Sequence, residues 1–144
     1  MKKVLCFLLA ILFFAFSLFS CGATRPSIED YQWKMRTAIR LDGDSFTVSA
    51  VEAEDSAHPE AKIIDMILIA QDGKITVTDL TNDKSYNGSY SLKNKTPDGA
   101  DYEITIDSLT GYGTVAMTEY ADGSEEPTLP ITLGDFSIYF YAEK

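Results

Sequence analysis

This sequence is poor in the residues that metal binding and nucleophilic catalysis use most often. It has 144 residues, with one histidine, two cysteines and one tryptophan. A zinc site needs several histidine or cysteine ligands, and covalent catalysis needs a nucleophile beside a base. The only histidine, His58, follows Ser56 in a polar stretch where a solvated loop is expected. We therefore expect no zinc site, no cofactor and no histidine-based catalysis.

Positive charge is also scarce. The chain has 12 basic and 22 acidic residues and a formal net charge of −10. A field of that sign repels phosphates, which argues against nucleic acid as a partner. Asp42 with Asp44, and Asp98 with Asp101, could supply oxygen ligands to calcium. Neither pair has the spacing of a calcium loop, and Asp-Gly pairs are typical of turns, so no metal site is expected.

One long apolar run stands at the start of the chain. Lys2 and Lys3 precede residues 4–19, which are apolar except for Ser17. A membrane-spanning helix needs about 20 apolar residues, and a run of this length after a positive start is typical of an export signal. The alternative is an uncleaved N-terminal membrane helix. Both interpretations place the rest of the chain outside the cytoplasm.

The end of this run resembles the lipobox of bacterial lipoproteins, in the order Leu18-Phe19-Ser20-Cys21. The resemblance implies that residues 1–20 are a signal peptide and that the sulfur of Cys21 carries diacylglycerol. It also implies that the new amine of Cys21 is acylated, with palmitate for example. Two or three acyl chains suffice for stable anchoring. Residues 21–27 would then be the lipidated cysteine and a short tether. The protein would be lipid-anchored to the cell membrane or outer membrane, as part of the cell envelope.

Residues 28–144 show the period of two that is typical of β-strands. Ser27 to Asp30 has the spacing of a capping box, which predicts one helical turn. Alternating or strongly apolar runs separated by turn residues then predict about nine short strands. They cover residues 31–41, 46–54, 63–70, 74–80, 86–92, 102–107, 111–120, 128–133 and 136–142. This density predicts an all-β domain, a small antiparallel meander barrel of eight or nine strands.

Three details of this pattern are open to test. On the first strand, alternation predicts that Trp33, Met35, Thr37, Ile39 and Leu41 share one face and that Lys34, Arg36, Ala38 and Arg40 share the other. The run at residues 63–70 is apolar on both faces, which favours a strand covered on both sides but leaves a buried helix as an alternative. Gly88, inside a strand, predicts a bulge or a sharp bend.

The strand order resembles the lipocalin-like barrels, in which a meander closes on an early strand that carries a tryptophan, here Trp33. The resemblance implies a cup that holds a small apolar ligand. Aromatic residues are numerous, and Trp33, Tyr90, Tyr102 and Phe140 are the candidate lining of that cup. We therefore expect a non-enzymatic, membrane-anchored ligand-binding protein.

Two other functions use different features of the sequence. On the last strand, Phe136, Ile138 and Phe140 share one face while Tyr139 and Tyr141 share the other. A filled barrel with outward aromatics would be an envelope module that binds another protein. The least favoured function is a hydrolase, because paired carboxylates can supply an acid and a base. Its candidates are Glu52, Glu54 and Asp55 in one group and Glu125 and Glu126 in another.

Overall fold

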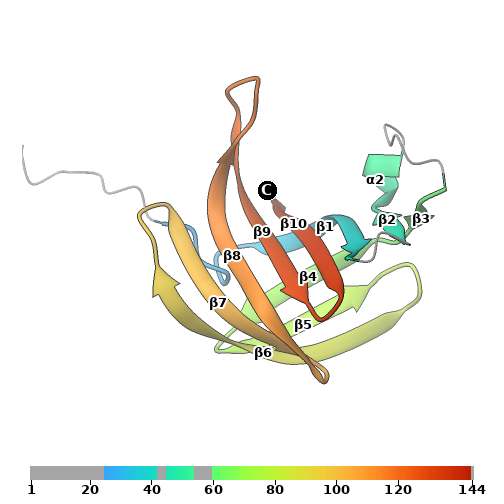
Figure 1. Cartoon of the computed structure of the whole chain (residues 1–144), viewed down its shortest axis with the longest axis horizontal. Coiled ribbons are helices and arrows are strands. Elements are labelled where there is room, and N and C mark those ends of the chain that lie inside the picture. Colours follow the sequence, from blue (N-terminus) through green and yellow to red (C-terminus); the bar gives the residue numbers. More distant parts are fainter. Residues whose placement is uncertain (1–24, 42–44, 54–59, 144) are drawn as a thin grey trace, which may run out of the picture.

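The computed structural model describes residues 25–41, 45–53 and 60–143. These residues form ten strands and one short helix, and they confirm the predicted all-β barrel (Figure 1). The elements are β1 Gln32–Arg40, β2 Phe46–Val48, α2 Ala50–Ala53, β3 Lys62–Ile63, β4 Met66–Gln71, β5 Lys74–Asp79, β6 Lys84–Lys95, β7 Gly99–Ile106, β8 Leu109–Glu119, β9 Glu125–Leu133 and β10 Phe136–Glu143. The helix alternative for residues 63–70 is wrong, because β3 ends at Ile63 and β4 begins at Met66. The expected cover on both sides is also wrong, since Ile63 and Ile69 are 50 % and 46 % exposed.

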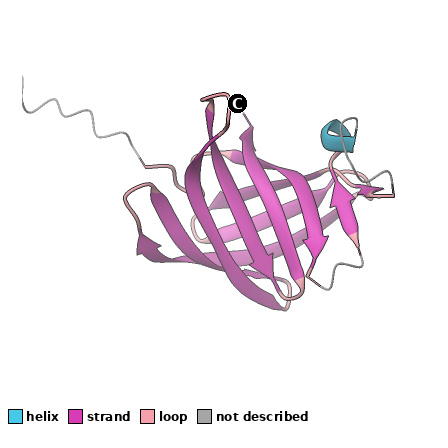
Figure 2. Cartoon of the chain, turned by 45° about the horizontal axis from the view of Figure 1, so that its top comes forward, coloured by secondary structure: helices cyan, strands magenta, loops and turns pink. Residues whose placement is uncertain are grey.

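Eight of these strands close into an antiparallel barrel. Each strand from β4 to β9 pairs with the next one along the chain, and β1 closes the ring by pairing with both β4 and β10. Two strands lie outside this ring: β2 pairs with β1, and β3 pairs in parallel with β2. Figure 2 shows β2, α2 and β3 grouped at one side of the barrel. Closure removes the open sheet edges of the eight barrel strands.

The barrel has two different ends. One end carries the turns after β4, β6 and β8, and the chain enters the domain there through residues 25–31. We call this the closed end. The other end carries the turns after β5, β7 and β9 (Figure 1), and we call it the open end. Inward side chains from all eight strands form one apolar core between the two ends.

A β-bulge in β1 overturns the predicted faces of that strand. The register with β10 shifts between Met35 and Thr37, because a bulge inserts one extra residue and changes which side chains face inward. Trp33 and Met35 point into the core as predicted. Beyond the bulge, however, the inward residues are Ala38 and Arg40, and not Thr37 and Ile39. Strict alternation from the sequence could not show this shift.

The strand predicted over residues 46–54 is also wrong after Val48. The chain turns into α2, where Ser49 acts as an N-cap: its hydroxyl accepts from Glu52 N at 3.3 Å and its carbonyl accepts from Ala53 N at 3.0 Å. A serine at the N-cap stabilises the start of a helix, because its hydroxyl accepts from a backbone N–H of the first turn that has no partner within the helix. Ala50 N also donates to Asp65 Oδ1 at 2.9 Å, which ties the helix to the chain entering β4.

Gly88 permits a close approach between strands, while the bulge in β6 lies elsewhere. Pairing through Gly88 is continuous with both β5 and β7, and the irregularity in β6 falls between Leu92 and Asn94. A Cβ on Gly88 would stand 1.9 Å from the carbonyl oxygen of Thr105. Only glycine allows this strand to coil so tightly onto its neighbour.

The turn from β5 to β6 at the open end is organised by one buried carboxylate. Asp79 is 3 % exposed and accepts from Thr81 N, from Asn82 N and from Asn82 Nδ2, at 3.0, 2.9 and 2.7 Å. Burial alone would raise the pKa of Asp79. The hydrogen bonds from Asn82 and Thr81 outweigh that effect and hold the pKa below its usual value.

We expect Asp79→Asn to destabilise the domain by about 1–2 kcal/mol at neutral pH, since hydrogen bonds to a charged acceptor are stronger than those to a neutral one. A carboxyl with a lowered folded-state pKa stabilises the fold above its unfolded pKa, and this contribution is lost as the pH falls through the folded value. Urea unfolding at several pH values should therefore show the wild-type advantage shrinking below about pH 4. Asp83→Asn, in the same turn but exposed, is the control, and an equal loss in both variants would contradict the assignment.

Candidate ligand cavity

An apolar cavity of about 330 Å³ occupies the open half of the barrel. Its lining comes from seven of the eight barrel strands, from β2 with the residue before it, and from Ile64 between β3 and β4. The lining residues are Ala38, Arg40, Ser45, Thr47, Ile64, Met66, Val77, Tyr86, Ile106, Ile131, Leu133, Phe136, Ile138 and Phe140. Because inward positions of neighbouring strands lie opposite one another, these side chains stack in rows across the sheet.

The rows differ in polarity with depth. The rim row at the open end is Ser45, Arg40, Phe136 and Leu133, joined by strand pairing and by the Arg40 N to Ser45 O hydrogen bond of 3.1 Å. The second row is Thr47, Ala38, Ile138 and Ile131. The third row is Met35, Phe140 and Leu129, all nearly fully buried. Polar side chains are thus present in the first two rows and absent from the third.

The N-terminal segment plugs the closed end of the barrel. Ile28 and Trp33 are 0 % exposed, and the Trp33 Nε1–H donates to the Ile28 carbonyl at 2.8 Å. Ile28 N in turn donates to the hydroxyl of Tyr102 at 3.4 Å, and Ser27 Oγ lies 3.3 Å from the same hydroxyl. This arrangement satisfies the buried polar groups of the segment and the indole N–H, which would otherwise cost free energy inside an apolar core.

A second set of bonds holds the plug to the sheet. The Glu29 carboxylate accepts from the hydroxyl of Tyr90 and from Asp72 N, the latter at 3.0 Å. The Tyr90 hydroxyl also accepts from Gly73 N at 3.2 Å. Ser27 N donates to Asp30 Oδ2 at 2.7 Å and Asp30 N donates to Ser27 O at 3.1 Å, so residues 27–30 form a hydrogen-bonded turn, in place of the predicted helical one. Pro26 and Ser27, placed with the tether on sequence grounds, therefore lie against the barrel.

The four residues predicted to line a cup occupy different parts of the barrel. Phe140 lines the cavity. Trp33 and Tyr102 belong to the plugged end, and Tyr90 lies beside them with its ring edge-on to Tyr102 at a centroid distance of 5.7 Å. Ala38, Arg40 and Tyr86 also line the cavity and were not predicted to do so. Tyr86 could have been found by its alternation with Tyr90, whereas Ala38 and Arg40 depend on the bulge.

Two of the carboxylates considered for hydrolysis, Glu52 and Glu126, form ion pairs with Arg36. Arg36, at the bulge, places Nε 2.8 Å from Glu52 Oε1 and Nη2 3.1 Å from Glu126 Oε1. The Nε–H makes no hydrogen bond within the described residues, so the contact with Glu52 is electrostatic. Nη1 donates to the Tyr120 hydroxyl at 2.9 Å, and the guanidinium lies 4.8 Å from the ring centre of Tyr141. This cluster ties α2 and the β8–β9 hairpin to β1 on the outer surface.

Around Tyr120, burial and the hydrogen bond to Glu126 raise the pKa of the phenol above its usual value, despite the opposing charge of Arg36. A neutral tyrosine that donates to Glu126 fits this arrangement. Glu125, the other member of the second acidic group, is exposed at the start of β9. Of the described members of the two acidic groups, Glu52 and Glu126 are therefore partners of Arg36, and Glu125 is a surface charge.

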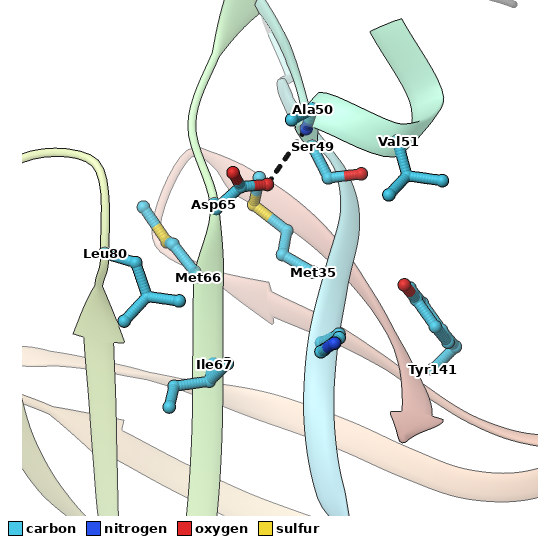
Figure 3. A pocket seen from close by; sticks show the side chains of 10 residues that line it. Met35, Ser49, Ala50, Val51, Asp65, Met66, Ile67, Leu80 and Tyr141 are labelled. Atoms are coloured by element: carbon cyan, nitrogen blue, oxygen red, sulfur yellow. Dashed lines mark hydrogen bonds between the residues drawn. The ribbon is translucent and has the colours of Figure 1, made fainter. Parts of the chain in front are cut away.

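A second hollow of about 250 Å³ lies between α2 and strands β1, β4 and β10. Figure 3 shows Met35, Ser49, Val51, Met66 and Tyr141 around it, with the Ala50–Asp65 hydrogen bond at its edge. Lys34 and Asp65 are its charged residues. It is smaller than the barrel cavity and opens on the surface beside the inserted helix.

Several residues singled out in the sequence lie outside the described ranges: Cys21, Asp42, Asp44, Glu54, Asp55, Ser56 and His58. Asp101 accepts from Thr114 Oγ1 at 2.9 Å and from Asn94 Nδ2 at 3.4 Å, as an ordinary strand residue. Among residues 25–41, 45–53 and 60–143, no three His, Cys, Asp or Glu side chains are grouped to hold a metal. In the same ranges no helix has the length and apolar content needed to cross a membrane.

Comparison of the chain with protein-family models, with curated proteins and with solved structures finds no match. The assignment of function therefore depends on the geometry of the barrel.

We expect Tyr102→Phe to loosen the plug and to lower the free energy of unfolding by about 0.5–1.5 kcal/mol, the usual net value of a hydrogen bond. The variant leaves Ile28 N without its acceptor while keeping the ring in the core. Urea unfolding followed by the emission of Trp33, the only tryptophan, measures the change. Tyr112→Phe on β8, where the side chain is 65 % exposed, is the control. Equal stability of Tyr102→Phe and wild type would show that the plug does not use this hydroxyl.

Proposed function

We propose that this protein is a lipid-anchored binding protein of the bacterial envelope that holds a small, largely apolar molecule in its barrel. The observation that carries the proposal is the cavity in the open half. It is enclosed by barrel strands and lined mostly by Ile, Leu, Val, Met, Phe and Tyr side chains. Ligand sites are typically concave, largely apolar and furnished with a few polar groups. The lipocalin-like resemblance points to the same kind of site.

The size of the cavity defines the size of its ligand. Its volume of about 330 Å³ falls at the lower end of ligand sites, which span roughly 300–1,000 Å³. An apolar cavity of about 150 Å³ holds one benzene molecule. Twice that volume suits a molecule of about a dozen non-hydrogen atoms, such as one short alkyl chain or a two-ring aromatic. A phospholipid with two full acyl chains is too large.

Anchoring at Cys21 would orient the barrel relative to the membrane. Cys21 lies outside the described residues, but only four residues separate it from Pro26, which is buried at the closed end. A fully extended chain spans about 3.5 Å per residue, so the acyl group would be within about 17 Å of Pro26. The closed end would therefore face the bilayer. The cavity would open toward the aqueous phase on the far side.

A cavity-filling substitution tests the binding site. We expect Ala38→Leu to weaken the binding of decan-1-ol, an 11-atom uncharged probe, at least tenfold, because the larger side chain occupies space in the second row. Folding stability should be unchanged or higher, since the new side chain fills apolar volume. Isothermal titration calorimetry on the purified domain measures the affinity. Ala121→Leu, in the exposed β8–β9 turn, is the control. Equal binding by Ala38→Leu and wild type, or no binding by either, would overturn the proposal.

The anchor has its own test in the native host. Wild-type protein is expected in the membrane fraction and the detergent phase, whereas Cys21→Ala is expected to lose the acyl chains and with them stable membrane association. Mass spectrometry of the wild-type N-terminus should find acylated Cys21 and no residues 1–20. Cys6→Ala, within the predicted signal peptide, is the matched control. A Cys21→Ala protein that stays wholly in the detergent phase would refute lipid anchoring at this residue.

A further inference from the structure

We propose that the cavity binds a single-chain anionic amphiphile, tail first, with its carboxylate at Arg40 and the hydroxyls of Ser45 and Thr47. This inference rests on the proposed function and names the ligand class of the same site. It follows from three features of the described residues: where the polar groups of the lining are placed, which end of the barrel is blocked, and how much space is left between them.

Polar groups are concentrated in one sector of the lining. Arg40 and Ser45 are neighbours in the rim row, and Thr47 stands opposite Ala38 in the second row. Arg40 ends β1, Ser45 immediately precedes β2, and Thr47 lies in β2. Within the described part of the lining, Tyr86 on β6 is the one other residue that carries a side-chain oxygen or nitrogen. An amphiphile with one polar head and one apolar body matches this distribution, because each part meets its own kind of surface.

The floor of the cavity is apolar and closed. Below the second row lie Met35, Phe140 and Leu129, which are 0–3 % exposed. Behind them the plug fills the barrel with Ile28 and Trp33. A ligand therefore enters and leaves through the open end. A charged head at the floor would be buried without a partner, which is costly, so the head stays at the rim and the tail points inward.

Among the described residues that line the cavity, Arg40 is the only charged one. A guanidinium carries five N–H donors and binds a carboxylate through two parallel hydrogen bonds. Arg40 makes other contacts in the protein, and its number of donors is compatible with a further acceptor. The chain as a whole carries a net charge of −10, so its long-range field repels anions. Preference for a carboxylate must therefore come from short-range contacts at Arg40.

The bulge at Arg36 is what brings this arginine into the cavity. With regular alternation from Trp33 and Met35, residue 40 would lie on the outer face with Lys34. The register shift between Met35 and Thr37 turns it inward, beside Ala38. Bulges commonly re-aim side chains next to functional sites. The same shift removes Ile39 from the lining, so one irregularity exchanges an apolar residue for a cation at the rim.

The test compares two ligands that differ in their heads. Decanoate and decan-1-ol are titrated calorimetrically into wild type, Arg40→Gln and Arg40→Lys. We expect wild type to bind decanoate about tenfold more tightly than decan-1-ol. Arg40→Gln should lose that preference while its affinity for decan-1-ol stays within about twofold. Arg40→Lys should retain part of the preference, because it keeps the charge without the forked donors.

Two further variants separate the local contact from general effects. Lys84→Gln removes one positive charge at the same end of the barrel, from an exposed side chain outside the lining, and it should leave the decanoate preference intact. Thr47→Val removes a hydroxyl from the second row at nearly constant volume, and it should weaken decanoate binding severalfold with little effect on decan-1-ol. It also provides a test that does not depend on Arg40→Gln folding correctly.

The outcomes distinguish the two proposals. Equal affinity of wild type for both ligands, unchanged in Arg40→Gln and Thr47→Val, would overturn the amphiphile inference while leaving apolar ligand binding in place. Loss of preference in Lys84→Gln to the same extent as in Arg40→Gln would show a general charge effect and also overturn it. Failure of wild type to bind either ligand would refute the proposed function itself.

Discussion

The hydrogen bond from the Trp33 indole to the Ile28 carbonyl holds the rest of the arrangement together. It seats the N-terminal segment inside one end of the barrel, where Tyr102 and Glu29 complete the contacts of the plug. A barrel of eight strands has just enough interior for side chains or for one small ligand. The plug and the core residues around it fill the closed half, whereas the open half contains the cavity of about 330 Å³.

The second constraint is the bulge in β1. This strand is shared by both parts of the barrel: its start carries Trp33 at the plug, and its end carries Ala38 and Arg40 at the cavity. At the bulge itself, Arg36 reaches outward to Glu52 and Glu126. One irregular residue thus anchors the inserted helix α2 on the outside and sets the polarity of the cavity rim on the inside.

The fold was largely predictable from the sequence, because period-two patterning and turn residues specify strands locally. The strands of residues 74–80 and 136–142 and the shared face of Phe136, Ile138 and Phe140 follow from this rule. The rule does not say which face of the last strand points inward. The cavity was not predictable in the same way. Its closed end depends on a long-range contact between Ile28 and Tyr102, in addition to the bond between Ile28 and Trp33 five residues away. Its rim depends on a bulge that has no signature in composition. Aromatic residues suggested a lining, yet three of the four named ones pack around the plug.

The most direct test of ligand binding in the open half of the barrel is an NMR titration of the mature domain with decanoate. The indole N–H of Trp33, the only tryptophan, reports on the plug, and the methyl groups of Ile131 and Ile138 report on the cavity. We expect saturable shifts of the two isoleucine methyl signals with little change at the Trp33 indole. A ligand-induced shift at Trp33 that leaves Ile131 and Ile138 unmoved would place binding at the other end and contradict it.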